Sequence, residues 1–486
     1  MVFTLKMITQ TLPRLLLLAS CAVVLSPTSV LASTLPWQSS EPSTVKAQAS
    51  STSVTQSMAR EISEHSQMMK NLEEMCDDIG PRLTGSPQLR QAQQWAMEKL
   101  KSYGAINVHE EAYDLGRPWK RGTERAQLLN ANRQSLDIRQ QAWTEGTKGV
   151  VRGEVVLLDV QTLAQFKAVA PSLKGKIVLA LSTPRATPEE RKDFKRYSAA
   201  LNETLRVANF SMILFVSERV GSLQDMSGSP SSRYNKNAGI ITQEHANLLK
   251  RLIARGQAPR IEVEFGGGFE KKPTKAYNVI ADLPGTEKPD EMVVLGVHQD
   301  SWDLASGATD NGVGVVVMME VLRTMKALGL QPKRSLRLVL FSGEEQGLLG
   351  SKAYVEAHRH ELEKIQAMLT QDAGGGRIDG FPDMQVDAWY EALTTAADSV
   401  KEIADLEIVY ARGGGSDQEA FFEKGIPAFG PRQEVLDYLT HTWHSQVDTI
   451  DHVKPANLIH NAKVMAGVAW SLLNADKLPH QKVDRR

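Results

Sequence analysis

The carboxyl-terminal half of the chain combines short apolar runs with one longer amphipathic stretch. Residues 292–297, 336–341 and 367–370 are short and largely apolar, which is typical of buried strands. Residues 311–328 carry apolar side chains close to helical spacing and are followed by Gly329, a residue that favours a helix end. This half therefore predicts buried strands and a helix between them.

The amino-terminal half has a different pattern. Apolar positions such as Ile62, Met68 and Leu72 predict helices between residues 57 and 100. Residues 117–265 instead contain short β-rich runs at 150–159, 176–181 and 212–216, separated by turns. Residues 33–57 are rich in Ser, Thr, Gln and Pro, and they predict a flexible tether.

Polar side chains follow each of the three apolar runs. His298 follows the first run, Glu344 and Glu345 follow the second, and Asp372 follows the third. Taken singly, these residues suit a structural histidine, a solvated charge pair and a turn before glycines. Their common position favours a site, because ligands of open α/β sheets bind outside the carboxyl ends of the strands.

Two further segments add to this set. Asp310, in SGATDNGVG, lies at the start of the predicted helix, where the helix dipole favours an anionic group and a carboxylate can bridge two cations. The alternative for Asp310 is a simple turn. His444, in HTWHSQVDT, supplies a second imidazole. Asp300 is the predicted partner for the His298 N–H that does not bind metal, with Asp303 as the alternative.

The combined inventory is two imidazoles, three carboxylates and one further carboxylate that remains as a base. Such a set binds a pair of borderline-hard divalent cations. Two ions roughly 3.5–4 Å apart can share and activate one water, so the inventory predicts metal-assisted hydrolysis.

These segments resemble the M28 family of dinuclear zinc peptidases, and most closely its carboxypeptidase Q branch. The resemblance spans about residues 60–475 and also includes an early GPRLTGS segment at 80–86. Its motifs are HQDSWD (298–303), GATDNGVG (307–314), PKRSLRLVLFSGEEQG (332–347), QDAGG (371–375), GGSDQEAF (414–421), GIPA (425–428) and WHSQVDT (443–449).

The resemblance implies two Zn²⁺ ions per chain. His298 and Asp372 would bind one ion, Glu345 and His444 would bind the other, and Asp310 would bridge both. Glu344 would be the general base.

Three further points follow from the resemblance. His444 is preferred to His441 because it lies four residues before Asp448, as in the family pattern H-x-x-x-D-T. Asn311 stands where relatives often carry a second Asp, which leaves the ligand set unchanged. The loop with Arg412, Ser416 and Asp417 is a candidate substrate loop.

The expected fold is α/β: a mixed, largely parallel sheet flanked by helices, with an inserted β-rich protease-associated domain. The alternative for the insertion is another β-rich domain. The predicted segments are a signal peptide (1–32), the tether (33–57), the first part of the peptidase domain (58–116), the insertion (117–265), the main catalytic domain (266–477) and a polar tail (478–486).

The amino terminus predicts export, to the periplasm or the medium. Lys6 and Arg14 precede an apolar stretch, and small residues precede Ser33, as in a cleaved signal peptide. The alternative is a lipobox with Cys21 as the lipidated residue, which would attach the protein to a membrane. After either processing only Cys76 remains as a free thiol, so no intrachain disulfide can form.

The predicted activity is that of an exported zinc-dependent exopeptidase acting on dipeptides or short peptides with a free amino terminus. A true carboxypeptidase of the same fold is the first alternative, and a glutaminyl cyclase-like acyltransferase is the second. A binding module of the transferrin-receptor type would have lost ligands, and here none is missing. The formal net charge of −1 gives no electrostatic basis for binding nucleic acid. A homodimer is implied by the resemblance alone.

Overall fold

The computed structural model describes residues 51–130, 133–230 and 237–479. A six-stranded sheet has the strand order β1-β12-β14-β13-β15-β18. Strands β14, β13, β15 and β18 run parallel, whereas β1 and β12 pair antiparallel to their neighbours. The strands are β1 (Ile106–Gly116), β12 (Thr274–Leu283), β13 (Lys288–His298), β14 (Arg334–Phe341), β15 (Ile365–Leu369) and β18 (Ala428–Phe429).

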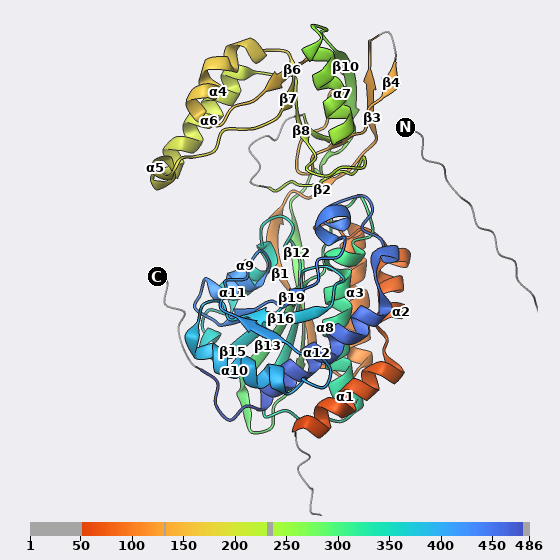
Figure 1. The fold of residues 1–486 in the computed structure, drawn as a ribbon, viewed down its shortest axis with the longest axis vertical. Coiled ribbons are helices and arrows are strands. Elements are labelled where there is room, and N and C mark those ends of the chain that lie inside the picture. Colours follow the sequence, from red (N-terminus) through yellow and green to blue (C-terminus); the bar gives the residue numbers. More distant parts are fainter. Residues whose placement is uncertain (1–50, 131–132, 231–236, 480–486) are drawn as a thin grey trace, which may run out of the picture. The chain divides into compact units, whose positions relative to one another are not determined.

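Helices cover both faces of this sheet (Figure 1). Helices α8 and α12 pack on one face, and α9 and α11 pack on the other. The helices of this part are α1 (Ser51–His65), α2 (Met68–Glu73), α3 (Pro87–Ser102), α8 (Val313–Ala327), α9 (Leu349–Ala357), α10 (Asp387–Asp398), α11 (Gln418–Phe422) and α12 (Pro455–Asn474). A small sheet of β16 (Ile378–Pro382), β17 (Glu407–Val409) and β19 (Arg432–Gln433) completes it.

The sheet is buried on both faces, which explains the apolar runs of its central strands. Residues 292–298 of β13 are all buried, as are residues 338–341 of β14. The predicted strands at 292–297, 336–341 and 367–370 therefore correspond to β13, β14 and β15. The predicted helix at 311–328 corresponds to α8, and Gly329 follows its end with a positive φ of 60°.

Strands β1 and β12 are neighbours in the sheet, although the intervening chain forms a second sheet. That sheet has eight strands in the order β4-β3-β10-β6-β7-β8-β9-β5. They are β3 (Glu124–Leu128), β4 (Gln134–Ser135), β5 (Ile138–Gln140), β6 (Val151–Leu158), β7 (Ile177–Ala180), β8 (Met212–Val216), β9 (Ala238–Ile241) and β10 (Arg260–Phe265). The short strands β2 (Trp119–Lys120) and β11 (Gly268–Phe269) pair beside it.

The inserted segment also contains helices, so "β-rich" describes it only in part. They are α4 (Leu163–Val169), α5 (Pro188–Lys192), α6 (Phe194–Ala208) and α7 (Gln243–Ala254). The side chains of β7 explain this arrangement because they alternate between two apolar clusters. Ile177 packs in the cluster that includes α7, and Val178 packs in the cluster that includes α4 and α6.

Helix α1 begins at Ser51, inside the segment 33–57 that was predicted as a flexible tether. The helix is held because Met58 and Ile62 are buried in the main core, with Val54 packed against it. The predicted signal peptide, Cys21 and the first part of the tether lie outside the described residues, as does most of the tail at 478–486. Among the described residues, no helix has the length and apolarity needed to span a membrane.

Candidate metal centre

The six side chains predicted for the site lie together at one edge of the six-stranded sheet. His298 is the last residue of β13, the two glutamates follow β14, and Asp372 follows β15. The parallel direction of these strands explains the convergence, since their carboxyl ends share one edge. The full set is His298, Asp310, Glu344, Glu345, Asp372 and His444.

Asp310 faces both histidines with different oxygens. Its Oδ1 lies 3.4 Å from Nε2 of His298, and its Oδ2 lies 3.7 Å from Nε2 of His444. His298 Nε2 is also 3.4 Å from Oδ1 of Asp372, and His444 Nε2 is 3.0 Å from Oε2 of Glu345. The closest of these pairs therefore form two groups that share Asp310, and Glu345 also lies near His298 and Asp310.

Several of these metal-ligating atoms are buried without a hydrogen-bond partner among the described residues. They are Nε2 of His298, Oδ2 of Asp310, Oε1 of Glu345 and Oδ1 of Asp372. Buried polar atoms in native proteins are almost always paired, so a cluster of unpaired ligand atoms calls for a bound group. Imidazole nitrogen and carboxylate oxygen are the donors that Zn²⁺ accepts, and the residues fit a divalent cation. Proximity alone also places Glu344 with His298 and Asp372, so distance does not separate a base from a ligand here.

Burial dominates the electrostatics of the two glutamates. It raises the pKa of Glu344 well above the usual range, and Asp372 adds to the rise while His298 opposes it. Burial, followed by the charge of Asp310, also raises the pKa of Glu345. Burial would raise the pKa of Asp372 as well, but the His298 imidazole holds it below its ordinary value. So dense a set of carboxylates favours bound cations, which would relieve their mutual repulsion.

The partner of the second His298 nitrogen differs from the prediction. Nδ1 of His298 donates to the backbone oxygen of Asp300 at 3.0 Å, whereas the nearest Asp300 carboxylate oxygen is 3.7 Å away. The carboxylate instead accepts hydrogen bonds from Thr84 and from the backbone N–H of Glu344. The alternative, Asp303, forms an ion pair with Arg121. Asp300 thus fixes the imidazole through its backbone and not through its side chain.

Asp310 lies in the turn at Ala308–Gly312 that precedes α8, and not in the helix itself. Asp448 holds this turn, since its carboxylate accepts hydrogen bonds from the backbone N–H groups of Thr309 and Asp310. Asn311 also contributes, because its side-chain oxygen accepts from the N–H of Gly314 at the start of α8. The role of Asp448 could have been inferred from its place in the H-x-x-x-D-T pattern.

Comparisons with known proteins agree with this geometry. The model of peptidase family M28 matches residues 278–469. A probable leucine aminopeptidase of Arthroderma otae is 30% identical over 275 residues, which cover 53% of this chain and 73% of that protein. The chain belongs to peptidase family M28. Carboxypeptidase Q of Mus musculus is 29% identical over 413 residues, covering 83% of this chain and 85% of that protein.

A solved structure shows the same fold. The peptidase M28 precursor of Shewanella amazonensis superposes with a TM-score of 0.75 at 28% identity, covering 88% of this chain and 99% of the other. Membership of M28 confirms the resemblance, the α/β fold class and the expectation of a metallo-exopeptidase. The protease-associated character of the inserted segment remains a prediction.

The structure distinguishes the two histidines near the end of the M28 region. His441 is exposed, and its Nδ1 lies 2.9 Å from the hydroxyl of Thr440. His444 is turned toward Glu345 and Asp310, and its ring lies against Trp443 with ring centroids 4.1 Å apart. Only His444 joins the donor set.

The three residues of the predicted substrate loop point in different directions. Ser416 lines a cavity of about 280 Å³ together with Asp372. Asp417 is buried, and burial raises its pKa to about 7. Arg412 does not line this cavity, because it pairs with Glu419 at 3.3 Å and lies over the ring of Phe422. Of the three residues, only Ser416 therefore lines the cavity beside Asp372, and Arg412 is exposed.

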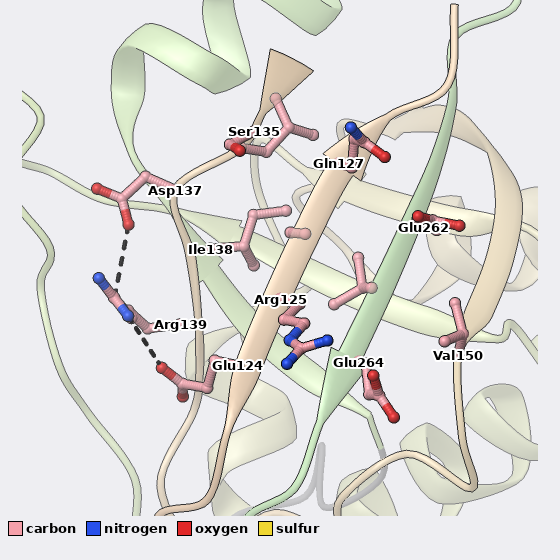
Figure 2. Close-up of a pocket in the computed structure, with 13 residues that line it drawn as sticks. Glu124, Arg125, Gln127, Ser135, Asp137, Ile138, Arg139, Val150, Glu262 and Glu264 are labelled. Atoms are coloured by element: carbon pink, nitrogen blue, oxygen red, sulfur yellow. Dashed lines mark hydrogen bonds and ion pairs between the residues drawn. The ribbon is translucent and has the colours of Figure 1, made fainter. Parts of the chain in front are cut away.

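A separate hollow lies in the second sheet (Figure 2). It has a volume of about 490 Å³ and is lined by residues of β3, β5 and β10. Its charges are partly paired, since Arg139 lies 3.4 Å from Glu124 and 3.5 Å from Asp137. None of the six donor side chains lines it, so it is not part of the metal centre.

Proposed function

We propose that this protein is an exported zinc-dependent exopeptidase that hydrolyses dipeptides or short peptides with a free amino terminus. The observation that carries the proposal is the placement of the two Asp310 oxygens, each toward a different histidine. That arrangement suits one carboxylate shared between two metal ions.

The metal assignment follows the two donor groups. His298 and Asp372 would hold one zinc ion, His444 and Glu345 would hold the other, and Asp310 would contact both. Bound zinc supplies two effects in such a site: it lowers the pKa of a coordinated water, and it polarises the peptide carbonyl. The complete donor set argues against the glutaminyl cyclase-like alternative, which typically works with one zinc.

Glu344 is the proposed general base. It precedes the ligand Glu345, so one turn after β14 holds the base beside the ligand. Glu344 takes a proton from the attacking water as the water oxygen bonds to the peptide carbonyl carbon. When the C–N bond breaks, Glu344 returns that proton to the leaving amine.

The direction of cleavage is inferred from charge. A carboxypeptidase needs a cation to hold the terminal carboxylate, and the predicted candidate, Arg412, is already paired with Glu419. This observation supports aminopeptidase or dipeptidase activity over the carboxypeptidase alternative, although relatives bear both kinds of name.

The test is a panel of dipeptides and tripeptides with free or blocked ends, assayed with zinc-loaded protein. N-acetylation is expected to abolish cleavage, and amidation of the carboxyl terminus is expected to be tolerated. Cleavage of acetylated peptides together with refusal of amidated ones would establish the carboxypeptidase alternative. Metal analysis of the same sample is expected to give about two zinc equivalents per chain.

Export, lipidation and assembly complete the proposal. The signal peptide predicts that the recovered protein begins near Ser33, which intact mass spectrometry measures directly. A chain beginning at a lipid-modified Cys21 would establish membrane anchoring instead. Light scattering after size-exclusion chromatography tests the homodimer implied by the resemblance.

A further inference from the structure

The guanidinium group of Arg82 is buried at the metal edge of the sheet, and within the described residues it donates only to backbone oxygens. Its exposed fraction is 0%. Nε donates to the oxygen of Gln299 at 2.8 Å, Nη2 to that of Gly307 at 2.8 Å, and Nη1 to those of Ser306 and Gly80 at 2.5 and 3.3 Å. None of the ion pairs found among the described residues includes Arg82. These four hydrogen bonds of the Arg82 side chain therefore all end on backbone oxygens.

Three of these four oxygens belong to the two loops that carry metal ligands. Gln299 directly follows His298, while Ser306 and Gly307 lie just before Asp310. Removing the guanidinium cation from water is costly, so the buried group must keep its hydrogen bonds. Because these bonds leave a rigid, planar group in fixed directions, they hold the two loops at a fixed separation.

The contact between these loops is tight. Arg82 and Ser301 form a reciprocal pair, in which the backbone N–H of Arg82 donates to the Ser301 hydroxyl and the N–H of Ser301 donates to the oxygen of Arg82. Gly307 has a φ of +65°, and a Cβ there would lie 2.3 Å from Cβ of Ser301. The spacing of the loops thus has little freedom.

Thr84 extends this support to the proposed base. Its hydroxyl donates to Oδ2 of Asp300 at 2.9 Å, and Oδ1 of Asp300 accepts the backbone N–H of Glu344 at 3.3 Å. Thr84 and Asp300 are both fully buried. The hydroxyl therefore orients a carboxylate that contacts both the His298 loop and the Glu344 turn.

We infer that Arg82 and Thr84 are positioning residues for the M28 reaction. Arg82 sets the separation of His298 from Asp310, and Thr84 sets the Glu344 turn through Asp300. The inference rests on the proposed roles of His298 and Asp310 as ligands and of Glu344 as the base. It gives the segment 80–86 a function, although this segment lies far upstream of the ligands in the sequence.

The test of Arg82 compares it with a second buried arginine. Arg334 is 1% exposed and also donates to backbone oxygens, those of Leu472 and Ala475, but it lies at the first residue of β14 and away from the ligands. The variants are Arg82→Lys and Arg334→Lys, which keep the charge and lose the fork geometry.

Arg82→Lys is expected to weaken zinc binding about 10–100-fold in a chelator competition, as loss of an outer hydrogen-bond partner does elsewhere. Arg334→Lys should bind zinc as the unchanged protein does, even if its thermal midpoint in the metal-free state falls by the same amount. Equal zinc affinity in the two variants would overturn the role of Arg82. If Arg82→Lys does not fold, Gly307→Ala replaces it, since it disturbs the same loop spacing, and wild-type zinc affinity in that variant would also overturn the role.

The test of Thr84 separates positioning from stability. Thr84→Val keeps the shape and removes the hydroxyl, and it is expected to lower kcat about tenfold or more with KM and zinc content unchanged. Thr84→Ser should restore kcat. Thr324→Val is the matched control, because Thr324 is buried in α8 and its hydroxyl has no hydrogen-bond partner in the described part of the chain.

A wild-type kcat in Thr84→Val, or a loss that Thr84→Ser does not restore, would overturn the role of Thr84. Failure of the proposed function would look different, because the unchanged protein would then not cleave peptides with a free amino terminus, or Glu344→Gln would remain active, whatever the Thr84 variants do.

Discussion

The carboxylate of Asp448 accepts a hydrogen bond from the backbone N–H of Asp310 at 3.1 Å. Its other oxygen accepts both the N–H and the hydroxyl of Thr309, each at 2.7 Å. Asp448 thereby fixes the turn that presents both Asp310 oxygens to the histidines. Asp448, which is not one of the six donors, thus sets the geometry of the shared ligand.

Replacing Asp448 by Asn should weaken zinc binding without unfolding the protein. The amide offers one accepting oxygen in place of two, so one buried donor of the turn loses its partner at a cost of about 1–3 kcal/mol. We expect zinc affinity to fall on the order of tenfold, measured by chelator competition. Asp282→Asn is the control, because it breaks an ion pair with Arg337 in the body of the sheet. Unchanged affinity in Asp448→Asn would contradict the prediction.

The two histidines should control different zinc ions. His298→Ala and His444→Ala are each expected to lose about one zinc equivalent and most activity, because each removes a donor from a separate group. Elemental analysis after gel filtration measures the loss. His441→Ala, the control, should retain both ions, since His441 is exposed outside the donor set. Full zinc content in both single variants would refute the ligand assignment.

The adjacent glutamates should behave differently when each is changed to Gln. Glu344→Gln cannot accept the proton, so kcat should fall by about 10²–10⁴-fold while both metals stay bound. Glu345→Gln should instead release zinc, because His444 would lose the carboxylate that lies 3.0 Å from its Nε2. Parallel measurement of kcat and zinc content separates the two cases. A nearly active Glu344→Gln would show that another group takes the proton.

The sequence predicted the central strands and four of the six donors because both are encoded locally. Strands β13, β14 and β15 are buried on both faces, and such strands are continuous apolar runs. Four of the six donors, His298, Glu344, Glu345 and Asp372, follow those runs, and the parallel strand direction brings these four together. Neither inference needs knowledge of a distant contact.

The parts that the sequence did not predict depend on contacts between distant segments. Arg82 reads as an ordinary polar residue until the loops at Gln299 and Gly307 surround it. Similarly, the surface position of Arg412 follows from its pairing with Glu419, which no spacing rule requires. The direction of the Asp300 carboxylate is set by Thr84, more than two hundred residues earlier in the chain.

A histidine outside the metal centre gives a prediction about pH and stability. His358 ends α9 and lies between two carboxylates, with Nε2 2.9 Å from Glu111 of β1 and Nδ1 2.5 Å from Glu361. The hydrogen bond to Glu111 is the main cause that raises the pKa of His358 above its ordinary value. Burial would raise the pKa of Glu111, but His358 holds it below its usual value. Protonated His358 therefore ties the edge strand β1 to α9.

The sign of the pH dependence follows from these shifts. Because the pKa of His358 is raised in the folded state, the protonated imidazole stabilises the folded protein fully below the unfolded-state pKa of about 6.5. This stabilisation is lost as the pH rises through the folded-state pKa of His358. The lowered pKa of Glu111 keeps the pair charged down to below about pH 4.5. His358→Gln should therefore destabilise the protein more at about pH 6 than at about pH 9.

Urea unfolding of the unchanged protein and of His358→Gln at both pH values measures this difference. Comparing the two proteins at each pH removes the pH dependence of zinc binding, which both share. Glu111→Gln serves as the partner variant, and adding it to His358→Gln should cost less than the sum of the two single changes because the residues interact. An equal loss of stability at both pH values would show that His358 contributes through packing against Tyr354, whose ring centroid lies 4.2 Å away, and not through its charge.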